Sequence, residues 1–206
     1  YILLSEFMLQ QTQVKTVIPY FLRFTNKIST LKKLSKTNEK QILKHWEGLG
    51  YYRRARHLLA TSKIIIKEKN SILPKTLPEL KKLPGIGDYT GNALLGLVYN
   101  QPRIALDGNV KRIFSRLINK RENKINFEKF VTKNKKKLFN SKRNSDFVEA
   151  IMEFGSLVCK PKDPHCNICI FKKFCKFKKS NAKNKLTSPI NFSKKSYSIF
   201  CYINNN

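Results

Sequence analysis

Four of the five cysteines occupy one short stretch of the chain, and their type and spacing could hold a metal centre. They follow the pattern Cys-x6-Cys-x2-Cys-x5-Cys, at Cys159, Cys166, Cys169 and Cys175. Such close and uneven spacing favours metal ligation over disulfide formation. Zinc ribbons usually offer two Cys-x-x-Cys pairs and this stretch has one, while an iron-sulfur cluster also takes four thiolates. The spacing alone therefore leaves zinc and a cluster open.

Two carboxylic acids could act as an acid–base pair, because their surroundings differ. Glu6 stands in the apolar string Leu3–Leu9, which should raise the pKa of its carboxyl and keep it protonated near neutral pH. Asp107 precedes a helical stripe that begins at Val110, so it can cap that helix, whose dipole favours a carboxylate there. In glycoside hydrolysis, two carboxyl groups with different pKa values take different catalytic roles, one of them as the general acid. On the residues alone, Glu6 could instead point to solvent and Asp107 could be only a cap.

The string Leu83-Pro84-Gly85-Ile86-Gly87 is typical of a hairpin between two helices. Gly85 and Gly87 would let backbone N–H groups approach a phosphate at the start of the next helix. By itself such a string is more often an ordinary turn. The net charge of +29, from 42 Lys and Arg against 13 Asp and Glu, favours a polyanion as the partner. An AT-rich genome would also enrich Lys, so the charge supports a nucleic-acid partner without proving it.

Helices must position these groups. Apolar residues recur at three- and four-residue spacing up to about Cys159, which predicts an all-α protein. Three helices are clearest. We expect them at Tyr52–Lys69, from Val110 to Ile118, and from Phe147 to Val158 with a buried stripe of Phe147, Ala150, Ile151, Phe154 and Val158.

The remainder of the chain differs in composition. Lys176–Lys185 is rich in Lys, Ser and Asn and reads as a linker, and a strand-like segment follows at Tyr197–Tyr202. No run of about 18 apolar residues occurs, so we expect no membrane association. Both ends look cut from a longer chain.

These features together resemble the endonuclease III and adenine glycosylase superfamily, over about residues 1–176. The motifs occur in the family's order, and the first two resemble the adenine glycosylase branch. They are Ser5-Glu6-Phe7-Met8-Leu9-Gln10-Gln11-Thr12-Gln13-Val14, Gly48-Leu49-Gly50-Tyr51-Tyr52, the hairpin, Leu106-Asp107-Gly108-Asn109-Val110 and the four cysteines.

The resemblance implies an all-α, two-lobed helix-hairpin-helix DNA glycosylase fold with an iron-sulfur cluster loop. Residues 1–101 would form a six-helix barrel lobe that lacks its N-terminal part, and 102–176 the lobe with a 4Fe-4S cluster. Residues 177–206 would be a basic linker and the start of a missing Nudix-like domain. A monomer in the bacterial cytoplasm, associated with the nucleoid, is implied.

The resemblance also implies the chemistry. Glu6 would protonate adenine mispaired with 8-oxoguanine or guanine in double-stranded DNA, and Asp107 would stabilise the sugar cation. The expected partner is therefore duplex DNA with a mismatch. Supporting catalytic roles fall to Tyr89 and Asn109, phosphate binding to Gly85 and Gly87, and substrate binding to Gln11, Thr12, Leu49, Tyr51 and Glu149.

Three of these residues, Gln11, Leu49 and Tyr51, would wedge into the duplex, and Glu149 would contact the adenine. Two alternatives remain. A glycosylase-lyase for oxidised pyrimidines would carry a Schiff-base lysine where this chain has Tyr89. A non-catalytic DNA-binding remnant would not need Glu6 and Asp107.

Overall fold

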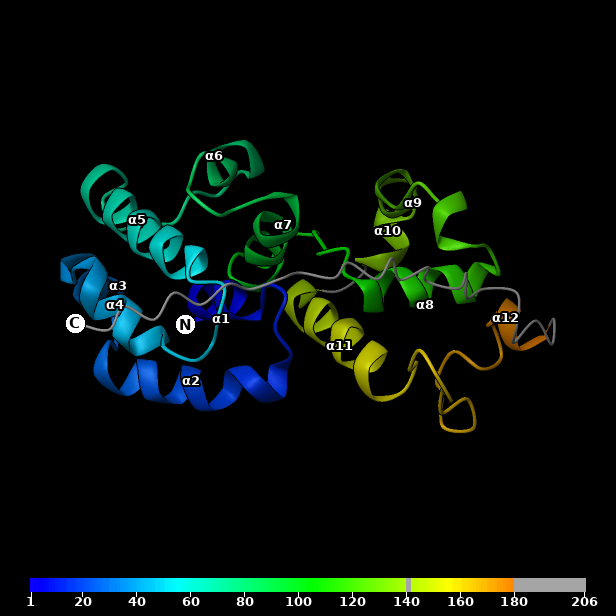
Figure 1. The fold of residues 1–206 in the computed structure, drawn as a ribbon. Coiled ribbons are helices and arrows are strands. Elements are labelled where there is room, and N and C mark those ends of the chain that lie inside the picture. The colour runs from blue at the N-terminus through cyan, green and yellow to red at the C-terminus, as the bar shows by residue number, and fades with distance from the viewer. Residues whose placement is uncertain (140–141, 180–206) are drawn as a thin grey trace.

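The computed structural model describes residues 1–139 and 142–179, and these ranges are helical and contain no strand (Figure 1). The expected all-α class is therefore confirmed. The elements are α1 Ile2–Leu9, α2 Val14–Lys27, α3 Leu31–Lys36, α4 Glu39–Trp46, α5 Arg53–Glu68, α6 Leu77–Lys81, α7 Asp88–Leu97, α8 Gly108–Ile118, the 3-10 helix η1 Glu122–Lys124, α9 Phe127–Lys133, α10 Lys135–Leu138, α11 Asn144–Leu157 and α12 Lys176–Lys179. The expected strand at Tyr197–Tyr202 lies outside the described residues.

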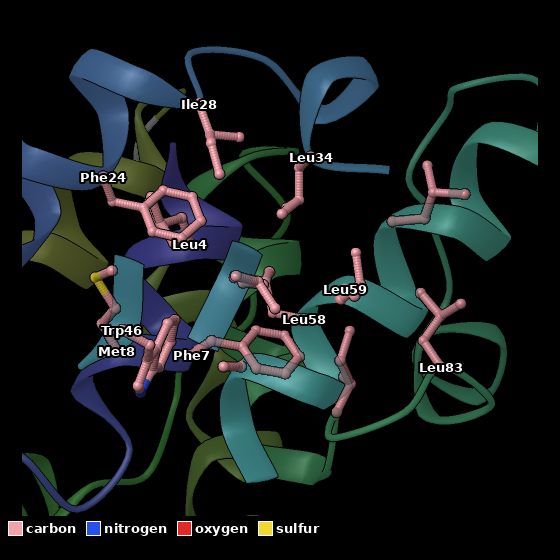
Figure 2. Close-up of a cluster of buried hydrophobic side chains, with 14 of the residues drawn as sticks. Leu4, Phe7, Met8, Phe24, Ile28, Leu34, Trp46, Leu58, Leu59 and Leu83 are labelled. Atoms are coloured by element: carbon pink, nitrogen blue, oxygen red, sulfur yellow. The ribbon is translucent and has the colours of Figure 1, made fainter. Parts of the chain in front are cut away.

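Helix α1 lies inside the first of two hydrophobic cores. Phe7 and Met8 are fully buried, and α1 packs against α2, α5 and α7. Figure 2 shows Phe7 and Met8 near Trp46, and Leu4 beside Phe24. Because apolar side chains surround most of this short helix, a polar residue on it can be enclosed with them. Glu6 is such a residue.

The second core lies around α8, α9 and α11. Its buried members are Ile104, Val110, Ile113, Phe114, Phe127 and Ile151. The expected stripe of α8 is confirmed. That of α11 is confirmed for Ile151, Phe147 and Phe154, which lie in or against this core, whereas Ala150 is exposed and Val148 is buried instead. The small side chain of Ala150 contributes little apolar area, so burying Val148 is favoured.

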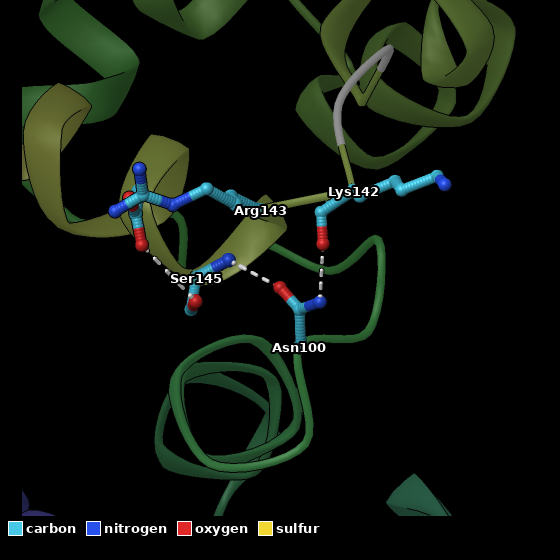
Figure 3. A network of polar contacts seen from close by, with 5 residues as sticks. Asn100, Lys142, Arg143 and Ser145 are labelled. Atoms are coloured by element: carbon cyan, nitrogen blue, oxygen red, sulfur yellow. Dashed lines mark hydrogen bonds and ion pairs between the residues drawn. The ribbon is translucent and has the colours of Figure 1, made fainter.

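The two cores meet where α7 packs against α11. The Cβ of any residue replacing Gly96 on α7 would lie 3.1 Å from a methyl group of Val148. Nearby, Asn100 holds the start of α11: its amide donates to the Lys142 carbonyl at 2.6 Å, and the Ser145 N–H donates to its Oδ1 at 2.9 Å (Figure 3). These polar contacts help to hold the start of α11 against the segment that follows α7, and so help to align the two cores.

The predicted linker is wrong at its start. Lys176–Lys179 forms α12, which packs on α8, and Phe177 is buried beside Arg116, whose guanidinium carbon lies 5.3 Å from its ring centroid. One aromatic side chain anchors a segment whose composition otherwise suggests disorder. Within the described residues, no helix is both long and apolar enough to cross a membrane.

Candidate active site and cysteine centre

Glu6 is the buried acid of the first core. It is 4% exposed, and in the described part of the chain its Oε2 is buried without a hydrogen-bond partner. Burial, and secondarily the nearby charge of Asp107, raises the pKa of its carboxyl from 4.5 to about 7. A carboxyl group with this pKa holds a proton near neutral pH and can give it to a base.

Asp107 caps the N-terminus of α8, as the sequence predicts. Its Oδ1 accepts from the Val110 N–H at 2.7 Å, and its Oδ2 accepts from the side-chain amide of Asn109 at 2.8 Å. Two donors and the N-terminus of the helix hold the Asp107 carboxyl group in place. The carboxyl group of Asp107 therefore lies near that of Glu6 on α1, whose pKa is raised.

Asn109 is itself held in place by Arg112. The Arg112 guanidinium donates to Asn109 Oδ1 at 2.7 Å, to the Gly155 carbonyl at 2.7 Å and to the Cys159 carbonyl at 2.8 Å. This line of contacts runs from Asp107 to the first cysteine. Arg112 is a site residue that the sequence does not mark, because an Arg on a basic helix carries no signal of its long-range partners.

Tyr89 lies on α7 near both acids. Burial, and then the charges of Glu6 and Asp107, raise the pKa of its phenol above the usual range, so the hydroxyl remains protonated. Tyr89 also lines a cleft between α7 and α9. Three cationic side chains, Arg103, Lys111 and Lys135, line the same cleft, together with the acidic side chains of Asp88 and Glu128.

The predicted hairpin connects α6 and α7. Gly85 has φ 78°, and a Cβ there would lie 2.7 Å from the Phe7 ring, which explains the need for glycine. Gly87 is exposed at the N-cap of α7 and leaves backbone donors open to an anion. Because Gln10 also donates to the Gly85 carbonyl at 3.2 Å, the hairpin is tied to the helix that carries Glu6.

Two of the three predicted wedge residues are exposed. Tyr51 is 60% exposed, and Gln11 is exposed on the turn after α1. Leu49 differs from the expectation, because it is only 5% exposed and packs in the first core. As a wedge it would have to leave that core. Thr12 is half-buried, and its hydroxyl contacts the Gln10 carbonyl at 3.5 Å.

Glu149 is exposed on α11, as expected for a residue off the apolar stripe. Within the described residues, no hydrogen bond or ion pair joins it to Glu6 or Asp107. Its expected contact with the substrate therefore stays a prediction.

The four cysteines line one pocket together with Arg116 and Phe177. Arg116 donates to Cys159 Sγ at 3.4 Å. Among the residues described, no three His, Cys, Asp or Glu side chains converge as they would on one ion. Four cysteine sulfurs that line one pocket are a donor set that both zinc and an iron-sulfur cluster accept.

Taken together, a glycine hairpin and a pair of unlike acids define a helix-hairpin-helix protein with a two-carboxylate site. The chain belongs to the family described as HhH-GPD superfamily base excision DNA repair protein, whose model matches residues 4–137. The fold is shared with a thermostable thymine-DNA glycosylase, at a TM-score of 0.75 and 24% identity, over 87% of this chain and 83% of that one. The predicted helix-hairpin-helix fold and the family are confirmed, whereas the iron-sulfur cluster loop stays a prediction.

Relatives extend the comparison beyond the family model. The adenine DNA glycosylase of Buchnera aphidicola subsp. Baizongia pistaciae (strain Bp) is 40% identical over 183 residues, 89% of this chain and 51% of that protein. That of Homo sapiens is 34% identical over 175 residues, 84% of this chain and 32% of that protein. The chain thus spans about half the length of the Buchnera relative.

Proposed function

We propose that this chain excises adenine from mismatched DNA, as a monofunctional glycosylase that hydrolyses the N-glycosidic bond. The observation that carries the proposal is Glu6, a buried acid with an unpartnered oxygen, a pKa of about 7 and a charged neighbour in Asp107. The names of relatives at 34–40% identity support adenine as the base.

In the proposed reaction, Glu6 gives its proton to N7 of a flipped adenine. The C1′–N9 bond then breaks, and its electron pair leaves with the base. Asp107 stabilises the cationic sugar, aided by the hydrogen bond from Asn109. Water adds to C1′, and its released proton restores Glu6. Tyr89, protonated beside both acids, would orient the sugar or the water.

Duplex DNA is the proposed partner, with adenine opposite 8-oxoguanine or guanine. The Gly85–Gly87 hairpin would bind backbone phosphate, and the cationic side chains of the cleft would lie along the strand. Gln11 and Tyr51 would occupy the gap left by the flipped base, with Thr12 beside them and Glu149 toward the adenine. We place this monomeric enzyme in the bacterial cytoplasm, at the nucleoid.

For the cysteine pocket we propose a 4Fe-4S cluster held by Cys159, Cys166, Cys169 and Cys175. The cluster would supply a structural crosslink for the loop that runs from α11 to α12. Support comes from the shared pocket and from the Arg116 contact to Cys159. We further propose two lobes, 1–101 and 102–176, each around one of the hydrophobic cores.

The decisive assay offers the purified protein two duplexes, one with adenine opposite 8-oxoguanine and one with thymine glycol. We expect free adenine from the first, with strand breaks that appear only after alkali, and nothing from the second. Borohydride present during the reaction should trap no covalent adduct at position 89. Absence of adenine release, with the cysteine site loaded, would overturn the proposal.

A further inference from the structure

Arg54 on α5 is a buried cation that the proposed reaction does not use. It is 6% exposed, and within the described residues no carboxylate pairs with it. Its guanidinium instead donates to five backbone carbonyls. These belong to Phe7, Met8, Gln10, Leu49 and Gly50.

The five carbonyls come from the last turn of α1 with Gln10, which follows it, and from the turn before α5, some 40 residues later in sequence. Nη1 binds the end of α1, and Nη2 binds the turn before α5. Trp46 donates to the Gly50 carbonyl as well, at 3.1 Å. The planar guanidinium of Arg54 therefore crosslinks the two turns. Because Trp46 is the chain's one tryptophan, its fluorescence can be used to follow the second turn.

Each turn contains one non-glycine residue in the left-handed region, directly after a carbonyl that Arg54 binds. Gln11 has φ 57° and follows Gln10, and Tyr51 has φ 49° and follows Gly50. Neither is glycine, so both conformations are strained and persist only if their surroundings fix them. The Tyr51 ring also lies 5.2 Å from the guanidinium carbon.

Both strained residues are exposed. Their backbone conformations therefore do not place a side chain in the core, and they determine the shape of the surface instead. An aromatic ring and an amide exposed on these two turns can stack on bases and hydrogen-bond to their edges. We propose that Arg54 is a positioning residue that locks Gln11 and Tyr51 in the conformations that unstack DNA. This inference rests on the proposed function, because it assigns these turns to the duplex.

The alternative is that Arg54 merely caps α1, whose last carbonyls need donors. A cap would require only the contacts to Phe7, Met8 and Gln10. The second set, to Leu49 and Gly50, is what couples the turns. Lysine could satisfy one set with its compact ammonium, but it lacks the fork that reaches both.

The test uses the full chain with its cysteine site loaded, as Arg54→Lys and Arg54→Met. The matched control is Arg56→Lys, on the same helix, exposed and paired with Glu39. The probe is a duplex with 2-aminopurine in place of the target adenine, opposite 8-oxoguanine. Its fluorescence rise at saturating protein measures unstacking and needs no excision.

We expect Arg54→Lys to keep the wild-type circular dichroism at 15 °C, to shift Trp46 emission, and to reduce the unstacking amplitude at least fivefold. Arg56→Lys should match wild type. Added to Gln11→Ala and Tyr51→Ala, Arg54→Lys should cause no further loss, since it acts through those residues.

Wild-type unstacking by a folded Arg54→Lys would overturn the inference, as would a further loss in the triple variant. If neither Arg54 variant folds, the residue is structural and the inference is wrong. A wild-type protein that unstacks the probe but releases no adenine would count against the proposed function alone.

Discussion

Gly155 of α11 lies directly against Asn109 of α8, so that a Cβ at position 155 would come within 2.6 Å of the Asn109 Cβ. The Gly155 carbonyl also accepts from Arg112, which in turn holds the Asn109 amide. Close approach of the two helices therefore fixes the side chain that donates to Asp107. The absence of a side chain at position 155 is a requirement of the site.

The first prediction concerns this contact. Gly155→Ala should displace Asn109, deprive Asp107 of a donor and lower the single-turnover excision rate about tenfold or more. Duplex affinity should change little, because Gly155 faces the interior. Gly108→Ala is the control, since a Cβ at Gly108 meets nothing within 4 Å. Equal rates for the two variants would contradict the prediction.

The second prediction follows from the raised pKa of Glu6. A general acid must be protonated, so the single-turnover rate should be level below about pH 7 and fall tenfold per pH unit well above it. Glu6→Gln should bind the duplex and cut at least a thousandfold more slowly. A rate that rises through pH 7 would exclude Glu6 as the acid.

The third prediction is the effect of the same residue on stability. The folded pKa of about 7 lies above the ordinary 4.5, so the folded state holds the extra proton and loses stability as pH rises between these values. Glu6→Gln should therefore be more stabilising at pH 8.5 than at pH 4, by up to about 3 kcal/mol. Urea unfolding at both pH values measures this difference. Glu68→Gln, at an exposed position, is the matched control for the substitution.

The sequence predicted the parts of the site that depend on local pattern. Asp107 before an amphipathic stripe is a cap by short-range geometry, and the apolar string around Glu6 anticipates its burial. Burial of Leu49, by contrast, depends on how the turn folds back on the core. Arg54 and Arg112 bind backbone carbonyls, and carbonyls belong to every residue, so no motif marks such partners.

The fourth prediction separates stability from activity at Gln11. Glycine adopts φ 57° without steric cost, so Gln11→Gly should raise the free energy of unfolding by up to about 1 kcal/mol. The same change removes the exposed amide and should slow excision about tenfold. Gln11→Ala should slow excision equally and bring no gain in stability. A gain in both properties would argue against a role in DNA.

The fifth prediction tests the cysteine centre. Cys166→Ser should abolish the brown colour and the iron and sulfide content of the purified protein, and with them DNA binding. Cys201→Ser should retain all of them, because Cys201 lies outside the four-cysteine stretch. Stoichiometric zinc in the wild-type protein, without sulfide, would overturn the cluster assignment.

The two acids belong to different cores, Glu6 to the first and Asp107 to the edge of the second, and the contacts of Asn100 with Lys142 and Ser145 help to align these cores. Those contacts are exposed to water, which competes for them, so the packing of α7 against α11 supplies the rest of the alignment. The proposed excision of adenine therefore requires docking of the two cores as well as folding of each. A duplex bound across both cores would favour the docked arrangement.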